Sequence, residues 1–329
     1  MKKMITVLLC AVLIMGALSG CGADMNLADD GKVSIITTIF PIYDWVNEIL
    51  GDEAEDVDLT LLIDSGVDLH NFQITANDII KISSCDMFIY AGGESDRWVE
   101  DTLSEVQNKD MVVINLLDVL GENAKEEEVV EGMQGELEDE EDHRHEGGGT
   151  EYDEHVWLSL KNASFFCRYI SERLGEIDTD HTEVYAANAA AYIEKLNSLD
   201  KEYQTAVDNA ARDTILFGDR FPFRYLVDDY GLNYYAAFVG CSAETEASFE
   251  TITFLAGKVD ELELSVILQI ESSDGSIPNT IRDSSTAKDQ TILTMDSMQS
   301  AAAVDIKNGV TYLSVMEGNL DILKQALEE

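Results

Sequence analysis

The sequence predicts an α/β fold in which two series of alternating strands and helices are separated by one long helix. Short β-branched, apolar runs alternate with amphipathic segments in residues 33–117 and again in residues 214–327. This alternation predicts mainly parallel sheets that are covered by helices. Between the two series, residues 181–212 contain no Gly or Pro and repeat apolar side chains at helical spacing, which predicts an uninterrupted helix.

The first series begins with an apolar, β-branched strand at residues 33–40. Pro41 follows it, at a position where proline starts a helix, and this helix is expected to end near Leu50. The same reasoning predicts the remaining elements of this part of the chain, which are strands at 58–63, 87–90 and 111–117 and helices at 74–84, 96–107 and 161–174.

The long central helix is rich in alanine, and its apolar side chains recur every three or four residues. About 30 residues at ~1.5 Å each give a length of roughly 45 Å. That length is sufficient to run along a molecule of two domains. The second series then follows, with strands at 214–217, 234–238, 265–270 and 291–295 and helices at 223–230, 249–262, 279–288 and 313–327.

The composition restricts the classes of function. The 329 residues are enough for two medium-sized domains, and 21 Lys and Arg against 65 Asp and Glu give a formal net charge of −44. Nucleic acids require Lys and Arg to neutralise their phosphates, so this charge argues against nucleic-acid binding. It also disfavours contact with an anionic lipid surface, whereas it is compatible with the attraction of cations.

The first 21 residues have the pattern of a bacterial lipoprotein signal peptide. Lys2 and Lys3 precede a short apolar stretch at 5–17, which ends in Leu-Ser-Gly-Cys at 18–21. The pattern resembles a lipobox and predicts cleavage before Cys21, lipid attachment at this residue, and a polar tether at 22–32. The mature chain would then be anchored at the extracytoplasmic face of the cell membrane. The alternative is an ordinary secretory signal.

Residues 122–154 form a strongly acidic segment with 15 Asp and Glu. Such a composition buries too little apolar surface to order itself, so we expect a mobile loop. His143 and His145 lie in this segment and are candidates for loose metal capture; the alternative is a solvated loop without that role.

After the signal segment, the cysteines are Cys85, Cys167 and Cys241, and their spacing matches no zinc motif. We interpret them as small buried hydrophobic residues, with at most one disulfide among them.

Two histidines are the primary candidates for a site. His70 follows the strand predicted at 58–63, and His155 follows the acidic segment. Both lie in loops on the carboxyl side of strand-rich segments, where open α/β sheets bind ligands. Imidazole suits zinc and other late divalent metals, although two histidines so far apart form no local motif.

Several stretches resemble the substrate-binding lipoproteins of zinc/manganese ABC transporters, the cluster 9 metal-binding family. They are TTIFPIYDWVNEILGD, GVDLHNFQITANDIIKISSCDMFIYAGG, YDEHVWLSLKNA, which is close to the family motif D-P-H-V-W-L-S-P, and YLSVMEGNLDILKQAL. The resemblance covers nearly all of residues 33–327. It implies two βα lobes with mainly parallel sheets, at 33–180 and 213–329, joined by one long rigid helix at 181–212.

The resemblance also implies a single metal ion between the lobes, with His70 and His155 as the first two ligands. Counting back from YGL, Arg220 stands where family members place a His or Glu ligand. A guanidinium has no lone pair to offer, so the adjacent Asp219 becomes the candidate third ligand. Glu271 is the natural fourth, with Asp274 a weaker candidate. Alternatively, Asp219 or Glu271 pairs with Arg220 and the site is built differently.

The function implied is capture of Zn²⁺ in the cleft and delivery to an ABC permease and its ATPase by a monomeric binding protein. The histidine-containing acidic loop is typical of the zinc branch of the family. Alternatives are a manganese- or iron-binding homologue, with Mn²⁺ as the cargo favoured by a more carboxylate-rich site, and a surface adhesin that retains the fold. We do not expect an enzyme, because a zinc hydrolase would need an H-E-x-x-H motif or a general base at fixed spacing.

Overall fold

The computed structural model describes residues 32–104, 106–134, 151–242 and 246–328. The predicted signal peptide with Cys21, the tether up to residue 31, and the loop residues His143 and His145 lie outside the described residues. Residues Val33–Glu329 form one compact unit, which contains both series of strands and helices.

The first sheet has four parallel strands in the order β2-β1-β3-β4. Its strands are β1 (Val33–Thr37), β2 (Val57–Leu61), β3 (Met87–Tyr90) and β4 (Val112–Asn115). The helices of this part are α2 (Phe40–Leu50), α3 (Ala76–Ser84), α4 (Trp98–Ser104), α5 (Leu116–Leu120) and α6 (Leu160–Ile177). Short 3-10 turns η2 (Leu69–Asn71) and η4 (Val156–Leu158) lie in its loops.

The second sheet repeats this design, with parallel strands in the order β6-β5-β7-β8. Its strands are β5 (Thr214–Phe221), β6 (Asn233–Val239), β7 (Val266–Ile270) and β8 (Thr291–Met295). Its helices are α8 (Arg224–Tyr230), α9 (Phe249–Glu261), α10 (Ser276–Ser284), α11 (Ala303–Lys307) and α12 (Tyr312–Leu327). The predicted fold class, two βα lobes with parallel sheets, is confirmed.

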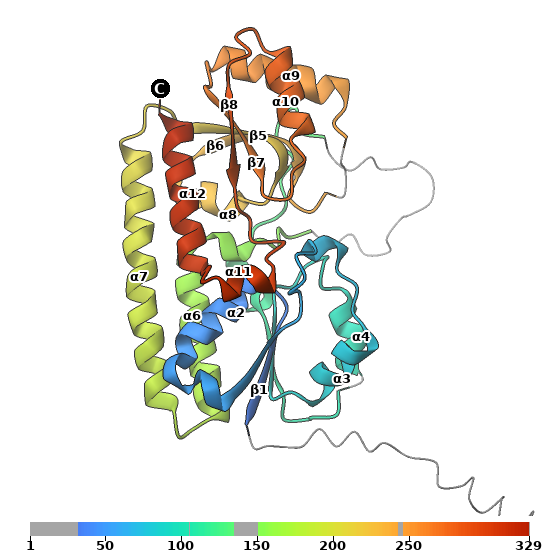
Figure 1. Cartoon of the computed structure of the whole chain (residues 1–329), viewed down its shortest axis with the longest axis vertical. Coiled ribbons are helices and arrows are strands. Elements are labelled where there is room, and N and C mark those ends of the chain that lie inside the picture. The colour runs from blue at the N-terminus through green and yellow to red at the C-terminus, as the bar shows by residue number, and fades with distance from the viewer. Residues whose placement is uncertain (1–31, 105, 135–150, 243–245, 329) are drawn as a thin grey trace, which may run out of the picture. The chain divides into compact units, whose positions relative to one another are not determined.

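Helix α7 (Thr182–Asp208) is the long helix expected from the sequence. Its 27 residues give a length of about 40 Å, and its buried face is formed by Tyr185, Ala189, Tyr192, Ile193, Leu196, Leu199 and Tyr203. Figure 1 shows α7 alongside α6 and α12, and it also contacts α2 and α8. Because α2 belongs to the first series and α8 to the second, this one helix supports both lobes.

The last helix, α12, lies beside α7 (Figure 1) and also contacts elements of both lobes. It contacts β5, β7 and β8 of the second sheet as well as α2 and α7. Tyr312 at its start donates its hydroxyl to the carbonyl of Trp157 (2.7 Å), and Tyr203 of α7 donates to the carbonyl of Met316 (2.6 Å). Both tyrosines are fully buried, so these bonds fix α12 within the core.

The acidic segment differs from the prediction at both of its ends. Glu126 pairs with Tyr152 in an antiparallel bridge, and Gln134 pairs with Phe238 of β6. Asp153 and Glu154 are buried, at 2% and 0% exposure. The mobile loop predicted at 122–154 is therefore too long. Residues at both ends of this segment are ordered because they pair with other parts of the chain. Helix α11 is also absent from the prediction.

None of the helices that the structure describes combines the length and the apolarity required to cross a membrane.

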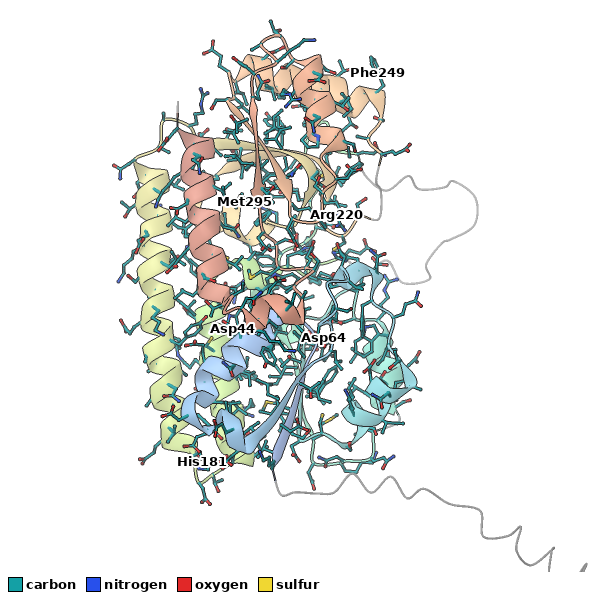
Figure 2. All side chains as sticks on the ribbon, viewed as in Figure 1. Asp44, Asp64, His181, Arg220, Phe249 and Met295 are labelled. Carbon is teal, nitrogen blue, oxygen red and sulfur yellow. The ribbon has the colours of Figure 1, made fainter. Side chains whose placement is uncertain are left out.

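Asp44 offers a test of how the core depends on pH (Figure 2). It is 5% exposed and accepts a hydrogen bond from the backbone N–H of Tyr312 (2.9 Å). Burial raises the pKa of Asp44 from 3.8 to about 6, and the bond from Tyr312 offsets only part of this. Its ionised form is therefore penalised in the folded protein, so stability is lost as the pH rises from about 4 to about 6.

We therefore expect Asp44→Asn to raise the free energy of unfolding by up to about 3 kcal/mol at pH 7. The gain should vanish below about pH 4, where the carboxyl group is protonated in both states. Urea unfolding at both pH values checks this, with the exposed Asp58→Asn of β2 as a control that shows no gain. An equal gain at both pH values would rule out the ionisation of Asp44 as its cause.

Candidate metal centre

His70 is placed by the turn η2, which follows β2. Asp68 caps this turn, and its Oδ1 accepts from the backbone N–H of His70 (3.0 Å). The imidazole Nδ1 faces two groups, the hydroxyl of Ser95 (2.7 Å) and Oε1 of Glu154 (3.2 Å). The Ser95 hydroxyl itself donates to Glu154, so its oxygen can only accept from the ring. Nδ1 of His70 therefore carries the hydrogen, and Nε2 retains its lone pair.

His155 is fully buried and directly precedes the turn η4. Its backbone N–H and its Nδ1 both donate to Oδ1 of Asp153, each at 2.9 Å. Burial lowers the pKa of His155, but the charge and hydrogen bond of Asp153 outweigh this effect and raise it overall. Trp157, two residues after His155, is also buried and donates its indole N–H to the carbonyl of Ser297 (2.9 Å). As with His70, the ring is fixed with its Nε2 lone pair free.

The two Nε2 atoms converge on one group, the side-chain amide of Gln299. Its nitrogen lies 3.2 Å from Nε2 of His70 and in hydrogen-bond contact with Nε2 of His155. The two ring centroids are 5.5 Å apart. The geometry thus confirms that the two distant histidines meet, and it places a hydrogen-bond donor where both lone pairs point.

Two glycines allow this close packing. A Cβ at Gly240 would lie 2.8 Å from Cε1 of His155, which is closer than carbon atoms approach one another. A Cβ at Gly93, where φ is +87°, would lie 2.7 Å from Cβ of Glu154. A side chain at either position would push a member of the histidine cluster out of place.

Four potential ligands lie within one small group, His70, Glu154, His155 and Cys241, with donor atoms all within 4.8 Å of one another. Donor atoms around one tetrahedral zinc ion lie about 3–4 Å apart, so only a small closure would be needed. Burial, with the nearby carboxylates of Glu154 and Asp153, raises the pKa of the Cys241 thiol well above its ordinary value. Cys241 is half-buried beside the centre, unlike the fully buried Cys85 and Cys167, and all three are free thiols.

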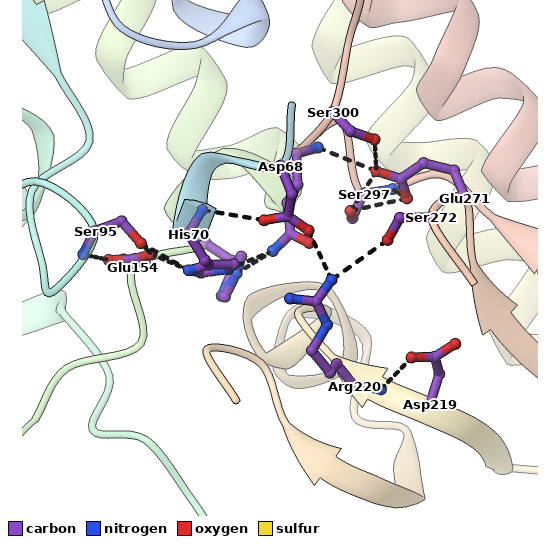
Figure 3. A network of polar contacts seen from close by, with 12 residues as sticks. Asp68, His70, Ser95, Glu154, Asp219, Arg220, Glu271, Ser272, Ser297 and Ser300 are labelled. Carbon is purple, nitrogen blue, oxygen red and sulfur yellow. Dashed lines mark hydrogen bonds and ion pairs between the residues drawn. The ribbon is translucent and has the colours of Figure 1, made fainter. Parts of the chain in front are cut away.

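Arg220 lies at the end of β5 and does not pair with Asp219 or Glu271 through its guanidinium. Nη2 forms an ion pair with Oδ2 of Asp68 (2.7 Å) and donates to the hydroxyl of Ser272 (3.3 Å) (Figure 3). Asp68 is the residue that caps the turn carrying His70. The pair therefore connects the second sheet to the loop of the first histidine.

Glu271 follows β7 and binds the loop after β8. Its carboxylate accepts from the N–H of Ser297 (2.8 Å), from the N–H of Gln299 (3.2 Å) and from the hydroxyls of Ser297 and Ser300. Asp219 accepts from the N–H of Arg220 (2.8 Å), and Figure 3 shows it on the far side of Arg220 from His70. The structure brings His70 and His155 together and leaves Glu271 and Asp219 outside the four-residue group.

Sequence reasoning missed Glu154, Cys241 and Gln299. A signal for Glu154 existed, because in DEHVWLSL it stands where the family motif D-P-H-V-W-L-S-P has a proline. A proline could neither accept from Nδ1 of His70 nor supply a negative charge. For Cys241 and Gln299 the sequence offers no signal, since tertiary packing alone brings them to the histidines.

The model of the family "Zinc-uptake complex component A periplasmic" matches residues 35–326. The chain belongs to this family. It is 32% identical over 301 residues to the zinc-binding lipoprotein AdcA of Streptococcus pneumoniae R6, covering 91% of this chain and 57% of that protein. It is also 27% identical over 321 residues to the high-affinity zinc uptake system protein ZnuA of Bacillus subtilis, covering 96% and 95%.

Among solved structures, the Zn(II)-bound ZnuA-like domain of S. pneumoniae AdcA superposes with a TM-score of 0.70 at 29% identity, covering 91% of this chain and all of that domain. The family membership confirms the fold that the resemblance implied. The chain spans 57% of the length of AdcA, so it matches the ZnuA-like part of that protein.

The ion pair between Arg220 and Asp68 can be tested directly. Their side chains are only 14% and 10% exposed, so removing the cation leaves a largely buried carboxylate unpaired. We expect Arg220→Met to lower the free energy of unfolding of the metal-free protein by about 3 kcal/mol, measured by urea unfolding. As a control, Arg97→Met breaks an exposed pair with Glu94 and should cost about 0.5 kcal/mol or less. Equal effects of the two substitutions would contradict a structural role for the buried pair.

Proposed function

We propose that this chain captures Zn²⁺ outside the cytoplasmic membrane and delivers it to an ABC permease driven by an ATPase. One observation carries the proposal. The imidazole of His155, which is fully buried, and that of His70, which is 10% exposed, direct their Nε2 lone pairs at one point, while each Nδ1 is held by a carboxylate. Metal-binding histidines characteristically have this arrangement, in which the second nitrogen donates to a carboxylate and fixes the tautomer.

The donors present fit zinc rather than a harder cation. Four carboxylates near the centre are occupied, Asp153 and Glu154 by the imidazoles, Asp68 by Arg220, and Glu271 by the loop that carries Gln299. The lone pairs directed at the centre therefore belong to nitrogen, which zinc accepts more readily than manganese does. His70 and His155 are the proposed ligands.

Glu271 stays the predicted carboxylate ligand. Its Oε1 accepts from the backbone N–H of Gln299, whose side chain lies between the imidazoles, so one residue links the carboxylate to both rings. Asp219 stays a weaker prediction, because its carboxylate accepts from the neighbouring backbone N–H.

Charge supports the capture of a cation. A pocket of about 280 Å³ opens beside Cys241, and its charged lining residues are Glu94, Arg97, Asp118, Glu127 and Glu151. Together with the net charge of −44, this acidic lining raises the local concentration of divalent cations. The predicted lipid anchor at Cys21 would keep the protein at the extracytoplasmic face of the membrane, near the permease. His143 and His145 would extend the capture surface.

Family membership favours this function over an adhesin or a hydrolase. The relatives of S. pneumoniae and B. subtilis are named as zinc-binding and zinc-uptake proteins, not as enzymes. We accordingly propose a binding protein, and the permease and ATPase as its partners.

Isothermal titration of the chelator-stripped protein with Zn²⁺ and Mn²⁺ tests the site. We expect His70→Ala and His155→Ala each to weaken zinc binding by about 3–4 kcal/mol, roughly 100- to 1,000-fold in Kd, because each removes one ligand. His181→Ala is the matched control. His181 lies at the start of α7, bound to Asp178 (2.8 Å), and its loss should leave the zinc affinity unchanged. Tighter binding of Mn²⁺ than of Zn²⁺ would instead support the manganese homologue.

Binding of Co²⁺ distinguishes two positions for the cation, one between the Nε2 atoms and one beside Glu154 and Cys241. If it binds the Nε2 atoms, Glu154 and Cys241 are not ligands, and Co²⁺ should give no thiolate-to-metal charge-transfer band in the near ultraviolet. Cys241→Ser should then change Kd by about 3-fold or less. A thiolate band that disappears in Cys241→Ser would place the cation with Glu154 and Cys241.

A further inference from the structure

Gln299 occupies the position that a cation would take between the two histidines. In the neutral rings both Nε2 atoms are acceptors, because both Nδ1 atoms carry the hydrogen that their acceptor partners require. The side-chain group of Gln299 that faces them is therefore the NH₂, which has two hydrogens to donate. One hydrogen bonds to His70 and the other to His155. The amide thus satisfies the same two lone pairs that a divalent cation would use.

The backbone of Gln299 is held in place by two hydrogen bonds. The backbone N–H of Gln299 donates to Glu271 (3.2 Å), and its carbonyl accepts from the N–H of Leu69 in the His70 loop (3.1 Å). The preceding residue, Met298, is 3% exposed and has a φ of +60°, in the left-handed region that bulky residues rarely adopt. Backbone strain of this kind persists where the surroundings enforce it, often at functional sites.

The side chain also lacks a complete set of partners. Gln299 is 2% exposed, yet its Oε1 is buried and accepts no hydrogen bond. An unsatisfied buried carbonyl oxygen is unfavourable, and native structures rarely retain one without a functional reason. The amide is therefore well bonded at its nitrogen but poorly bonded at its oxygen, which makes its displacement easier than that of a fully bonded group.

We propose that Gln299 is a latch that competes with the cation for the two imidazoles, an inference that rests on the proposed function. A zinc ion about 2.0–2.1 Å from both Nε2 atoms would overlap the amide nitrogen, so the two cannot be bound together. Rotating the amide by half a turn only exchanges its oxygen for its nitrogen in the same space. Binding therefore requires the side chain to withdraw from the space between the two Nε2 atoms.

The latch lowers affinity and slows capture, because the cation must break two hydrogen bonds before it binds. Two bonds of ordinary net strength correspond to roughly a 10- to 100-fold change in a binding equilibrium. The same latch favours release, since the amide returns to the imidazoles as the ion leaves. A protein that must deliver its cargo benefits from such a competitor within its own site.

The test is titration of the full chain, stripped with chelator, with Zn²⁺ against a competing chromophoric chelator, together with stopped-flow association. Gln299→Ala removes both hydrogen bonds and opens the space, so we expect Kd to fall at least about 10-fold, mainly through faster association. Gln290→Ala is the matched control, because Gln290 is also buried but lies outside the group. It should bind zinc as the unsubstituted chain does.

The ¹⁵N-resolved NMR signal of the Gln299 side-chain amide, identified by its loss in Gln299→Ala, gives a second measurement. In the metal-free protein its hydrogens should be protected from exchange, and one equivalent of Zn²⁺ should abolish that protection. Zinc binding by Gln299→Ala that is equal to or weaker than that of the unsubstituted chain, or an amide signal that zinc leaves unchanged, overturns the latch while the proposed function stands. Failure of both the unsubstituted chain and the variant to bind zinc overturns the proposed function, and the latch with it.

Discussion

The site depends on the pairing of each imidazole with a carboxylate through its Nδ1. Asp153 and Glu154 are consecutive residues, yet they serve different histidines. Asp153 turns back to the ring of His155, whereas Glu154 reaches across to His70, with Ser95 between them. A buried imidazole without such a partner would be costly and free to rotate. With these partners, both rings present the same nitrogen toward one point, and the proposed zinc binding depends on this common direction.

Three loops from distant parts of the sequence hold this arrangement. The indole of Trp157 donates to the loop after β8 at Ser297, and Leu69 in the His70 loop donates to the same loop at Gln299. Glu271, at the end of β7, binds the loop after β8 by accepting a hydrogen bond from the backbone of Ser297. Helices α7 and α12 contact elements of both lobes. Because the frame is bonded on several sides, we infer that metal exchange involves a local change in the loop of Gln299 more than a wide rotation of the lobes.

Arg220 changes the electrostatics of the cleft compared with the ligand that family resemblance places there. It cannot bind a cation, but it neutralises Asp68 and so removes one carboxylate from competition for metal. Asp153, Glu154 and Glu271 are likewise engaged by hydrogen-bond donors. Under the proposed function, nitrogen lone pairs directed at the centre, with these carboxylates turned to other partners, would favour zinc over harder cations. Metal preference would then depend as much on the partners of the acids as on the identity of the ligands.

Local patterns in the sequence were enough to predict most elements of the fold, because period and capping are local properties. The strand Met87–Tyr90 and the helix that Pro41 starts follow from such signals. The sequence also identified His70 and His155 as candidate ligands, from their place in loops and from the family resemblance, and that role stays a prediction. The tertiary structure decided which nitrogen each ring presents, that Arg220 pairs with Asp68, and that Gln299 lies between the imidazoles. These contacts join residues far apart in the chain, and only the packing of two lobes against two shared helices determines which of many polar side chains meet.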